Sequence, residues 1–174
     1  IDPFTNLLNE QTLKQRLEHD FKLAGRYNKE LSTVVIELKD IYDFAARGID
    51  FETADKMLRD IGGIVVDLLP DGCYAGRVEK TKIVMVLKDF SREQALQKAV
   101  LLFERSIDAI RALRIDAANA QMIVIAYSDR KGFTDSYDAM TGRLERHISM
   151  ALKQKEYGIV SSERGKAGLE NIKS

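Results

Sequence analysis

Short runs of β-branched and aliphatic residues alternate with long amphipathic segments along the whole chain. The clearest run covers residues 32–38 (STVVIEL) and predicts a buried strand. In the segments between such runs, apolar residues recur every three or four positions, which is the period of a helix with one buried face. A chain with this alternation buries its apolar surface by covering a sheet with helices. We therefore predict an α/β fold of the α+β sandwich type.

The predicted elements follow one another without an internal repeat. In chain order they are a helix over 9–29, a strand over 32–38, a short helix within 40–50, a helix over 51–69, strands over 73–78 and 82–87, a helix over 92–113, a strand over 121–127, a helix over 135–155 and an edge strand at 159–160. The two strands around the polar residues 79–81 form a β-hairpin. Residues 161–174 contain few apolar side chains, so we expect a loose tail.

The charges of the chain are balanced, with 27 Lys and Arg residues against 27 Asp and Glu residues. Without a net positive field, we expect no binding to nucleic acid and no direct contact of this domain with a membrane. The single cysteine, Cys73, excludes an intramolecular disulfide and favours a reducing, cytoplasmic setting. A membrane anchor elsewhere in a parent protein is compatible with this expectation. We expect His19 and His147, which lie on predicted helices, to be solvated.

The N-terminal string Ile1-Asp2-Pro3-Phe4-Thr5 begins without Met and resembles the remnant of a cloning vector after tag cleavage. We therefore leave residues 1–5 out of the functional residues. The predicted domain then covers residues 6–160 and the tail covers residues 161–174. We expect the chain to be a piece of a longer protein.

Three local strings stand in order along the chain: residues 6–10 (NLLNE), residues 55–58 (DKML) and residues 155–158 (KEYG). They resemble the opening Gly-Leu-x-Asn-Arg, the Asp-x-x-Leu and the closing Lys-x-x-Gly of the GGDEF family of bacterial diguanylate cyclases. Arg77 stands two residues ahead of the hairpin turn, as in the family. Asp2 and Thr5 match the residues that precede the opening string, but they lie in the expected vector remnant. The resemblance covers essentially the whole chain and implies a nucleotidyl-cyclase-like mixed sheet with a β-hairpin, covered by helices.

Active members of the family condense two GTP into cyclic di-GMP at a Gly-Gly-Asp-Glu-Phe signature. Aligned on Arg77, the resemblance places this signature on residues that keep only its apolar last position in kind: Glu79, Lys80, Thr81, Lys82 and Ile83. The two glycines let the backbone approach the nucleotide phosphates, a role that a side chain obstructs. Glu79 also directs a carboxylate toward phosphate anions. We therefore expect the turn not to hold a nucleotide.

The family implies Mg²⁺ bound by two carboxylates, one at the end of the first strand and one at the third signature position. These positions hold Glu37 and Thr81 here, and two further family acids are replaced by Lys39 and Lys82. With one carboxylate of the two, we expect no metal and no other cofactor. We expect Glu37 to pair with Lys39 or Lys82, and the alternative is that all three are solvated surface charges.

The family's guanine-binding residues are also incomplete. Its base-binding Asn falls near Ala45 or Ala46, whereas its partner Asp survives as Asp55. The product-inhibition motif Arg-x-x-Asp falls on Pro70 and Cys73. The remnant pocket positions in the resemblance are Glu37, Lys39, Asp55 and Lys155. These replacements argue against binding of GTP or cyclic di-GMP.

We therefore expect a catalytically inactive GGDEF-like domain, not an enzyme, that serves as a protein-interaction, dimerisation or relay module within a larger bacterial signalling protein. Its expected partner is another protein or a second copy of the chain. The alternative is a non-catalytic nucleotide sensor in which Lys80, Lys82 and Lys155 contact phosphates. An enzyme with altered chemistry is a third possibility, for which the site has too few carboxylates.

Overall fold

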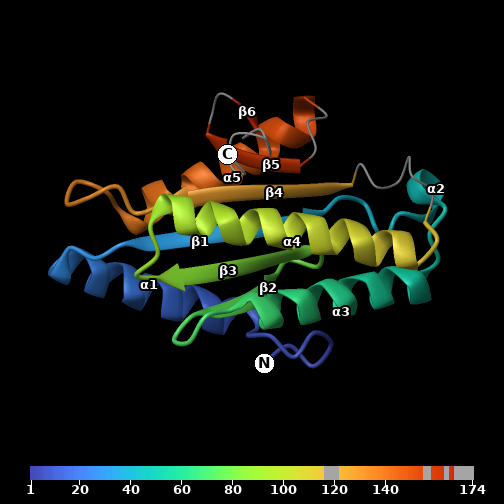
Figure 1. Ribbon diagram of the computed structural model, residues 1–174, viewed down its shortest axis with the longest axis horizontal. Helices are drawn as coiled ribbons and strands as arrows, with labels where there is room; N and C mark the ends of the chain where they lie inside the picture. The colour runs from blue at the N-terminus through green and yellow to red at the C-terminus, as the bar shows by residue number, and fades with distance from the viewer. Residues whose placement is uncertain (116–121, 155–157, 163–164, 167–174) are drawn as a thin grey trace.

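The computed structural model describes residues 1–115, 122–154, 158–162 and 165–166 of the chain. Within these residues one sheet of six strands runs through the centre of the molecule in the order β2-β3-β1-β4-β5-β6 (Figure 1). The strands are β1 (Leu31–Leu38), β2 (Tyr74–Val78), β3 (Lys82–Lys88), β4 (Ile123–Asp129), β5 (Gly158–Ser162) and β6 (Gly165–Lys166). Strand β1 is antiparallel to both β3 and β4, and β5 is parallel to β4. The predicted α/β fold with a mixed sheet and a β2–β3 hairpin is confirmed.

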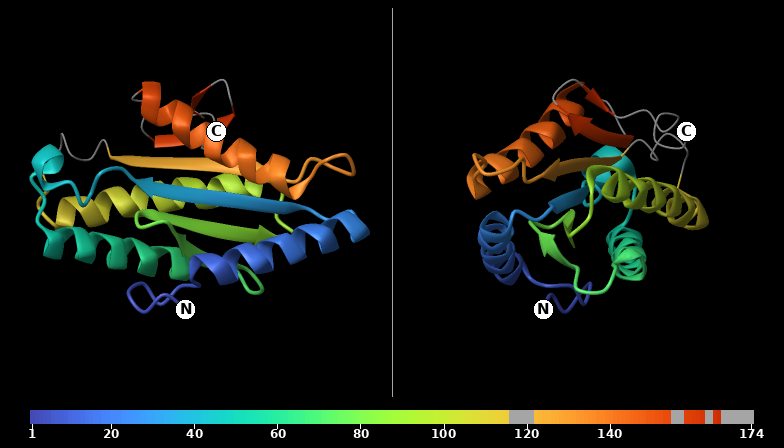
Figure 2. Two further views of the ribbon diagram at one scale, coloured as in Figure 1. Left: turned by 180° about the vertical axis from the view of Figure 1, so that it is seen from behind. Right: turned by 60° about the vertical axis from the view of Figure 1, so that its left-hand side comes forward.

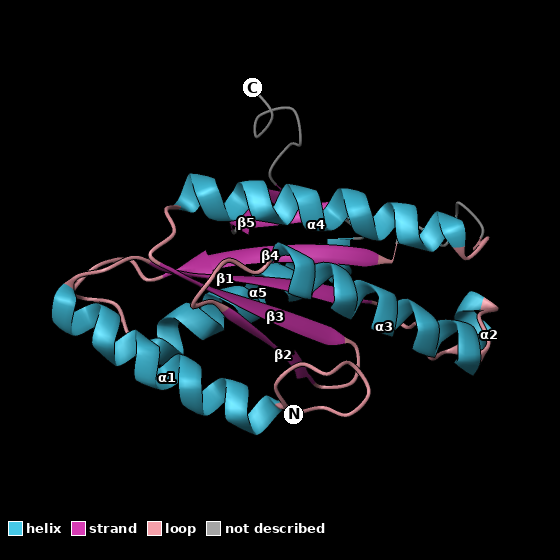
Figure 3. Cartoon of the chain, turned by 60° about the horizontal axis from the view of Figure 1, so that its bottom comes forward, coloured by secondary structure: helices cyan, strands magenta, loops and turns pink. Residues whose placement is uncertain are grey.

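Helices cover both faces of the sheet, as the right-hand view of Figure 2 shows. The helices are α1 (Glu10–Tyr27), α2 (Phe44–Arg47), α3 (Phe51–Leu68), α4 (Arg92–Ala112) and α5 (Tyr137–Gln154). On one face, Ile36 of β1 belongs to the core cluster that contains residues of α3 and α4. On the other face, Val35 packs in a cluster with residues of α1 and α5. Short α2 lies at one end of the molecule, beside the start of α3 (Figure 3).

Local hydrogen bonds explain where three of the long helices begin. Asn9 and Asp50 accept hydrogen bonds from the backbone N–H groups three residues onward, at 2.9 and 2.7 Å, and so cap α1 and α3. Ser91 and Gln94 form a reciprocal capping box at the start of α4. These caps determine the residues at which α1, α3 and α4 begin.

The structure differs from the sequence prediction near the C-terminus. Strand β4 extends to Asp129, because this residue pairs with Ser32 of β1. Strand β5 is not at the edge of the sheet, since β6 pairs with it. The prediction of a loose tail is therefore wrong for residues 161–162, which belong to β5, and for residues 165–166, which form β6. His147 is buried and contacts the Tyr127 carbonyl through Nδ1 at 2.9 Å, so its predicted solvation is also wrong.

In the part of the chain that the structure describes, no helix combines the length and the apolar character needed to cross a membrane.

Candidate functional site

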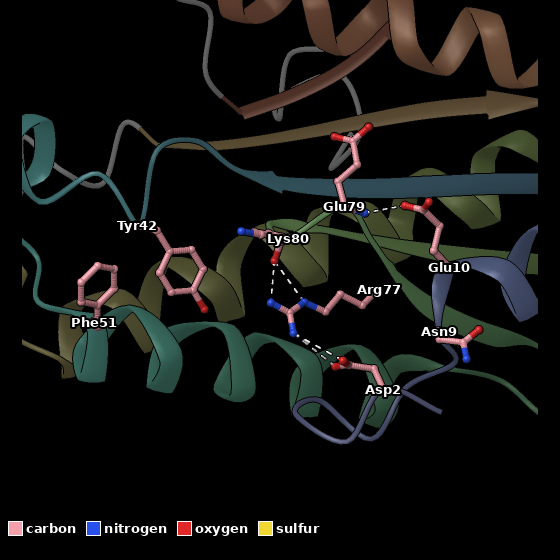
Figure 4. Close-up of a pocket in the computed structure, with 8 residues that line it drawn as sticks. All are labelled: Asp2, Asn9, Glu10, Tyr42, Phe51, Arg77, Glu79 and Lys80. Carbon is pink, nitrogen blue, oxygen red and sulfur yellow. Dashed lines mark hydrogen bonds and ion pairs between the residues drawn. The ribbon is translucent and has the colours of Figure 1, made fainter.

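Two adjoining cavities lie where the β2–β3 turn meets the end of β1 and the start of α3. The first has a volume of about 720 Å³ and is lined by Asp2, Asn9, Glu10, Tyr42, Phe51, Arg77, Glu79 and Lys80 (Figure 4). The second has a volume of about 630 Å³ and is lined by Glu37, Asp40, Tyr42, Asp43, Phe44, Phe51, Lys80 and Thr81. The cavities share Tyr42, Phe51 and Lys80. Four of the nine predicted site residues, Glu37, Glu79, Lys80 and Thr81, therefore line these two cavities.

Arg77 holds the hairpin turn from below, as Figure 4 shows. Its Nε and Nη2 atoms donate to the Lys80 carbonyl at 3.0 and 2.9 Å. On the other side of the turn, the Glu79 N–H donates to Glu10 Oε1 at 2.6 Å, which lowers the pKa of that carboxyl. Glu79 itself has a φ of 52°, a left-handed conformation that costs a non-glycine residue roughly 1–2 kcal/mol. The turn is thus fixed by contacts to its backbone.

Asp2 connects the N-terminal segment to Arg77. Its carboxylate accepts hydrogen bonds from the Thr5 N–H at 2.8 Å and the Thr5 hydroxyl at 2.6 Å, and it lies 3.4 Å from Arg77 Nη1. Burial raises the pKa of Asp2, but the Thr5 hydrogen bonds and the Arg77 charge outweigh this effect, so the net pKa is lowered. The structure therefore places Asp2 and Thr5 beside the hairpin turn, whereas the origin of residues 1–5 as a vector remnant stays a prediction. The match of Asp2 and Thr5 to the family motif was the signal that could have placed them.

Glu37 and Thr81 form a hydrogen bond between the end of β1 and the hairpin turn. The Thr81 hydroxyl donates to Glu37 Oε1 at 2.9 Å, and Glu37 is only 8% exposed. Its second oxygen, Oε2, is buried without a hydrogen-bond partner among the described residues. Burial raises the pKa of Glu37, opposed by the Thr81 hydrogen bond and by the charge of Lys82. The carboxylate is therefore held in a place where its charge is poorly compensated.

The predicted ion pairs of Glu37 are wrong. Lys82 lies opposite Glu37 in the β1–β3 register, but its ammonium group pairs with Glu79 at 2.9 Å. Lys39 contributes its carbonyl, which accepts a hydrogen bond from Arg47 Nε at 3.3 Å. The alternative of three solvated charges is also wrong, because Glu37 is buried. Sequence alternation placed the strand residues on a face, but it did not specify which hydrogen bond each would form.

Tyr42 is hydrogen-bonded to the carboxylate of Asp55. The Tyr42 hydroxyl donates to Asp55 Oδ1 at 2.8 Å, and its ring stacks on Phe51 with centroids 6.2 Å apart and planes at 28°. Burial and the Asp55 carboxylate raise the pKa of Tyr42 to about 12. Sequence reasoning missed Tyr42, because no local pattern relates it to a carboxylate 13 positions away.

Two further predicted site residues, Ile83 and Lys155, are not among the described residues that line the two cavities. Ile83 is buried and packs in the core beneath the hairpin. Lys155 lies outside the described residues.

The family model described as "Diguanylate cyclase, GGDEF domain" matches residues 1–127 of the chain. The chain belongs to the GGDEF family. Solved GGDEF domains share its fold at low sequence identity. The domain of DgcB from Caulobacter crescentus, in complex with c-di-GMP, superimposes with a TM-score of 0.72 at 15% identity, covering 93% of this chain and 95% of that one.

Two further structures support the same fold. The active GGEEF domain of a diguanylate cyclase from Vibrio cholerae gives a TM-score of 0.71 at 16% identity, covering 89% of this chain and 98% of that one. The FimX GGDEF domain from Pseudomonas aeruginosa gives 0.72 at 17% identity, covering 92% and 98%. A search among curated proteins finds none that matches the chain.

The residues present do not fit the Mg²⁺ ion that the GGDEF family implies. Mg²⁺ prefers carboxylate oxygens. At the two family positions this domain has a single carboxylate, Glu37, and a hydroxyl, Thr81, whose proton points to Glu37. Among the described residues, no group of three His, Cys, Asp or Glu side chains comes together as metal ligands.

Proposed function

We propose that this GGDEF domain does not synthesise cyclic di-GMP and serves as a non-catalytic interaction, dimerisation or relay module of a larger bacterial signalling protein. The hydrogen bond from Thr81 to Glu37 carries the proposal. Condensing two GTP requires metal ions that neutralise the phosphates and activate the attacking hydroxyl. A hydroxyl-to-carboxylate bond supplies neither.

The charges around the turn also argue against a bound triphosphate. The first cavity is lined by three acidic residues, Asp2, Glu10 and Glu79, of which Glu79 pairs with Lys82. Its arginine, Arg77, is already engaged by Asp2 and by the Lys80 carbonyl. Anionic phosphates would therefore meet like charges in a partly desolvated space.

A protein partner agrees with what a relative of the same fold does. The diguanylate cyclase SiaD from Pseudomonas aeruginosa has been solved in complex with its activator SiaC, and it matches at a TM-score of 0.71 and 16% identity, covering 92% of this chain and 61% of that one. By analogy, we propose that this domain also binds a protein, either a different one or a second copy of itself.

The alternative of a nucleotide sensor has weaker support. Of its three proposed phosphate contacts, Lys82 is paired with Glu79 at 2.9 Å. Lys80 lines both cavities, and Lys155 lies outside the described residues. The sensor hypothesis therefore rests on one lysine beside several carboxylates.

The test is a cyclase assay with GTP and either Mg²⁺ or Mn²⁺ at high protein concentration. We expect the domain to form no cyclic di-GMP. The matched control restores five family residues at the signature and the first strand, by Glu37→Asp, Glu79→Gly, Lys80→Gly, Thr81→Asp and Lys82→Glu, and we expect it to bind GTP with Mg²⁺. Cyclic di-GMP formed by the unaltered domain would overturn the proposal.

A further inference from the structure

The second cavity has an unusual combination of aromatic rings and carboxylates. Its lining contains three aromatic side chains, three carboxylates, one ammonium group and one hydroxyl: Tyr42, Phe44, Phe51, Glu37, Asp40, Asp43, Lys80 and Thr81. The carboxylates outnumber the ammonium group. A space of about 630 Å³ with this lining favours a positively charged occupant.

The aromatic rings of this cavity are held open to solvent. Phe44 is 62% exposed and Phe51 is 66% exposed, although both are large apolar side chains. Phe51 stacks on Tyr42, so two of the rings already form a platform. Aromatic faces attract ammonium and guanidinium groups, and the attraction is strongest where water is partly excluded.

Glu37 provides an independent observation that points to a cation. Its side chain lines the cavity, is 8% exposed, and has one oxygen without a hydrogen-bond partner among the described residues. A buried carboxylate normally has its charge compensated by a partner. A cation in the adjoining space would supply that compensation.

We propose that this cavity binds an organic cation, a guanidinium or alkylammonium group that stacks on the aromatic rings and faces the carboxylates. The group belongs either to a basic side chain of a partner protein or to a free small cation. This inference goes beyond the non-catalytic role and does not depend on it, because it concerns the charge of the ligand and not catalysis.

Lys80 separates this inference from the nucleotide-sensor alternative. Its ammonium group lines the cavity and repels a second cation. Lys80→Ala should therefore strengthen the binding of an organic cation several-fold, roughly threefold to tenfold by removal of one near charge. A phosphate-binding site would lose affinity from the same substitution. Lys80→Ala thus changes affinity in opposite directions for an organic-cation site and for a phosphate site.

The experiment is calorimetric titration of the domain with three probes, which are acetyl-arginine amide, putrescine and MgCl₂. We expect saturable one-to-one binding of at least one organic cation. Phe51→Ala should weaken it roughly fivefold. The matched control is Phe133→Ala, which removes the same ring from a residue that is 76% exposed and does not line the cavity. Phe44→Ala, at a second exposed ring, serves if Phe51→Ala fails to fold.

The results test the proposal and also show whether the bound cation comes from a protein side chain or from a free small molecule. Tighter binding of acetyl-arginine amide than of putrescine assigns the site to a protein side chain, and the reverse assigns it to a free small cation. The proposal is overturned if neither organic cation binds, if Lys80→Ala weakens their binding, if Phe133→Ala has the same effect as Phe51→Ala, or if MgCl₂ binds in preference.

Discussion

Two regions of the site have changed to different extents relative to the GGDEF family pattern. The turn frame, which we define as Asp2, Thr5, Gly76 and Arg77, keeps the family's Asp, Thr and Arg and fixes the backbone of the hairpin turn. The pocket wall, defined as Glu37, Tyr42, Asp55 and Thr81, keeps the family's Asp as Asp55, but that carboxylate is occupied by Tyr42. The frame satisfies its polar groups, whereas the wall leaves a buried Glu37 oxygen without a partner among the described residues.

The difference shows why the fold can outlast the chemistry. Arg77 bonds to the carbonyl of Lys80, and Glu10 accepts from the N–H of Glu79. These contacts use backbone groups, so they persist whatever side chains stand in the turn. Metal binding depends on side chains instead, so we expect a single replacement such as Thr81 to remove it.

The largest expected effect is in the frame, at Gly76. An added Cβ there would lie 2.8 Å from the Leu13 Cβ atom of α1. Gly76→Ala should therefore destabilise the domain by roughly 2 kcal/mol, measured by urea unfolding. Gly63→Ala is the matched control, because its Cβ would meet nothing within 4 Å and it lies in α3. We expect that control to stabilise by about 0.5–1 kcal/mol. If Gly76→Ala and Gly63→Ala change the free energy of unfolding equally, the close packing of Gly76 against Leu13 does not contribute to the turn frame.

The next effect is at Arg77. Arg77→Ala loses the Asp2 ion pair and both hydrogen bonds to the Lys80 carbonyl. We therefore expect its free energy of unfolding to fall by about 1–2 kcal/mol. Lys56→Ala, which breaks the exposed Lys56–Asp60 pair, should change stability by less than about 0.5 kcal/mol. If unfolding of the two variants is indistinguishable, Arg77 does not hold the turn.

In the pocket wall, Glu37 should make stability depend on pH. Because its pKa is raised in the folded state, its contribution to stability is fully present below its unfolded pKa and is lost as pH rises through the folded pKa. Glu37→Gln cannot ionise, so it should be more stable than the unaltered domain at neutral pH. The advantage should shrink as the pH falls into the acid range.

The control for this pH dependence is Glu30→Gln, at an exposed glutamate. Thermal unfolding from pH 4 to pH 8 measures both variants. An advantage of Glu37→Gln that does not change with pH, or a loss of stability at neutral pH, would contradict the buried and poorly compensated charge.

The smallest expected effect is at Tyr42. Tyr42→Phe removes the hydrogen bond to Asp55 and keeps the ring on Phe51, so stability should fall by about 0.5 kcal/mol. Tyr27→Phe, at a tyrosine that is 63% exposed, should have no effect. Absorbance titration at alkaline pH should also lose a tyrosine that ionises at about 12 in Tyr42→Phe. Loss of a tyrosine that ionises near the ordinary value of 10 would contradict this contact.

The fold was largely predictable because its signals are local. The period of the apolar residues located the helices, and caps such as Asn9 and Asp50 lie where the predicted helices begin. The site was predictable as a set of positions but not as a set of contacts. Lys82 pairs with Glu79 and not with Glu37, a choice set by side-chain geometry. Asp2 reaches Arg77 across 75 positions, which no local pattern records.

The central claim is that the pocket wall no longer binds the GTP–Mg²⁺ complex, and thermal unfolding with and without GTP and Mg²⁺ tests it most directly. A ligand at 100 times its dissociation constant adds about 2.7 kcal/mol to the native state, which is readily measured as a raised midpoint. We predict no rise for the unaltered domain and a clear rise for the variant with the five family residues restored. A Mg²⁺-dependent rise in the unaltered domain would contradict the account.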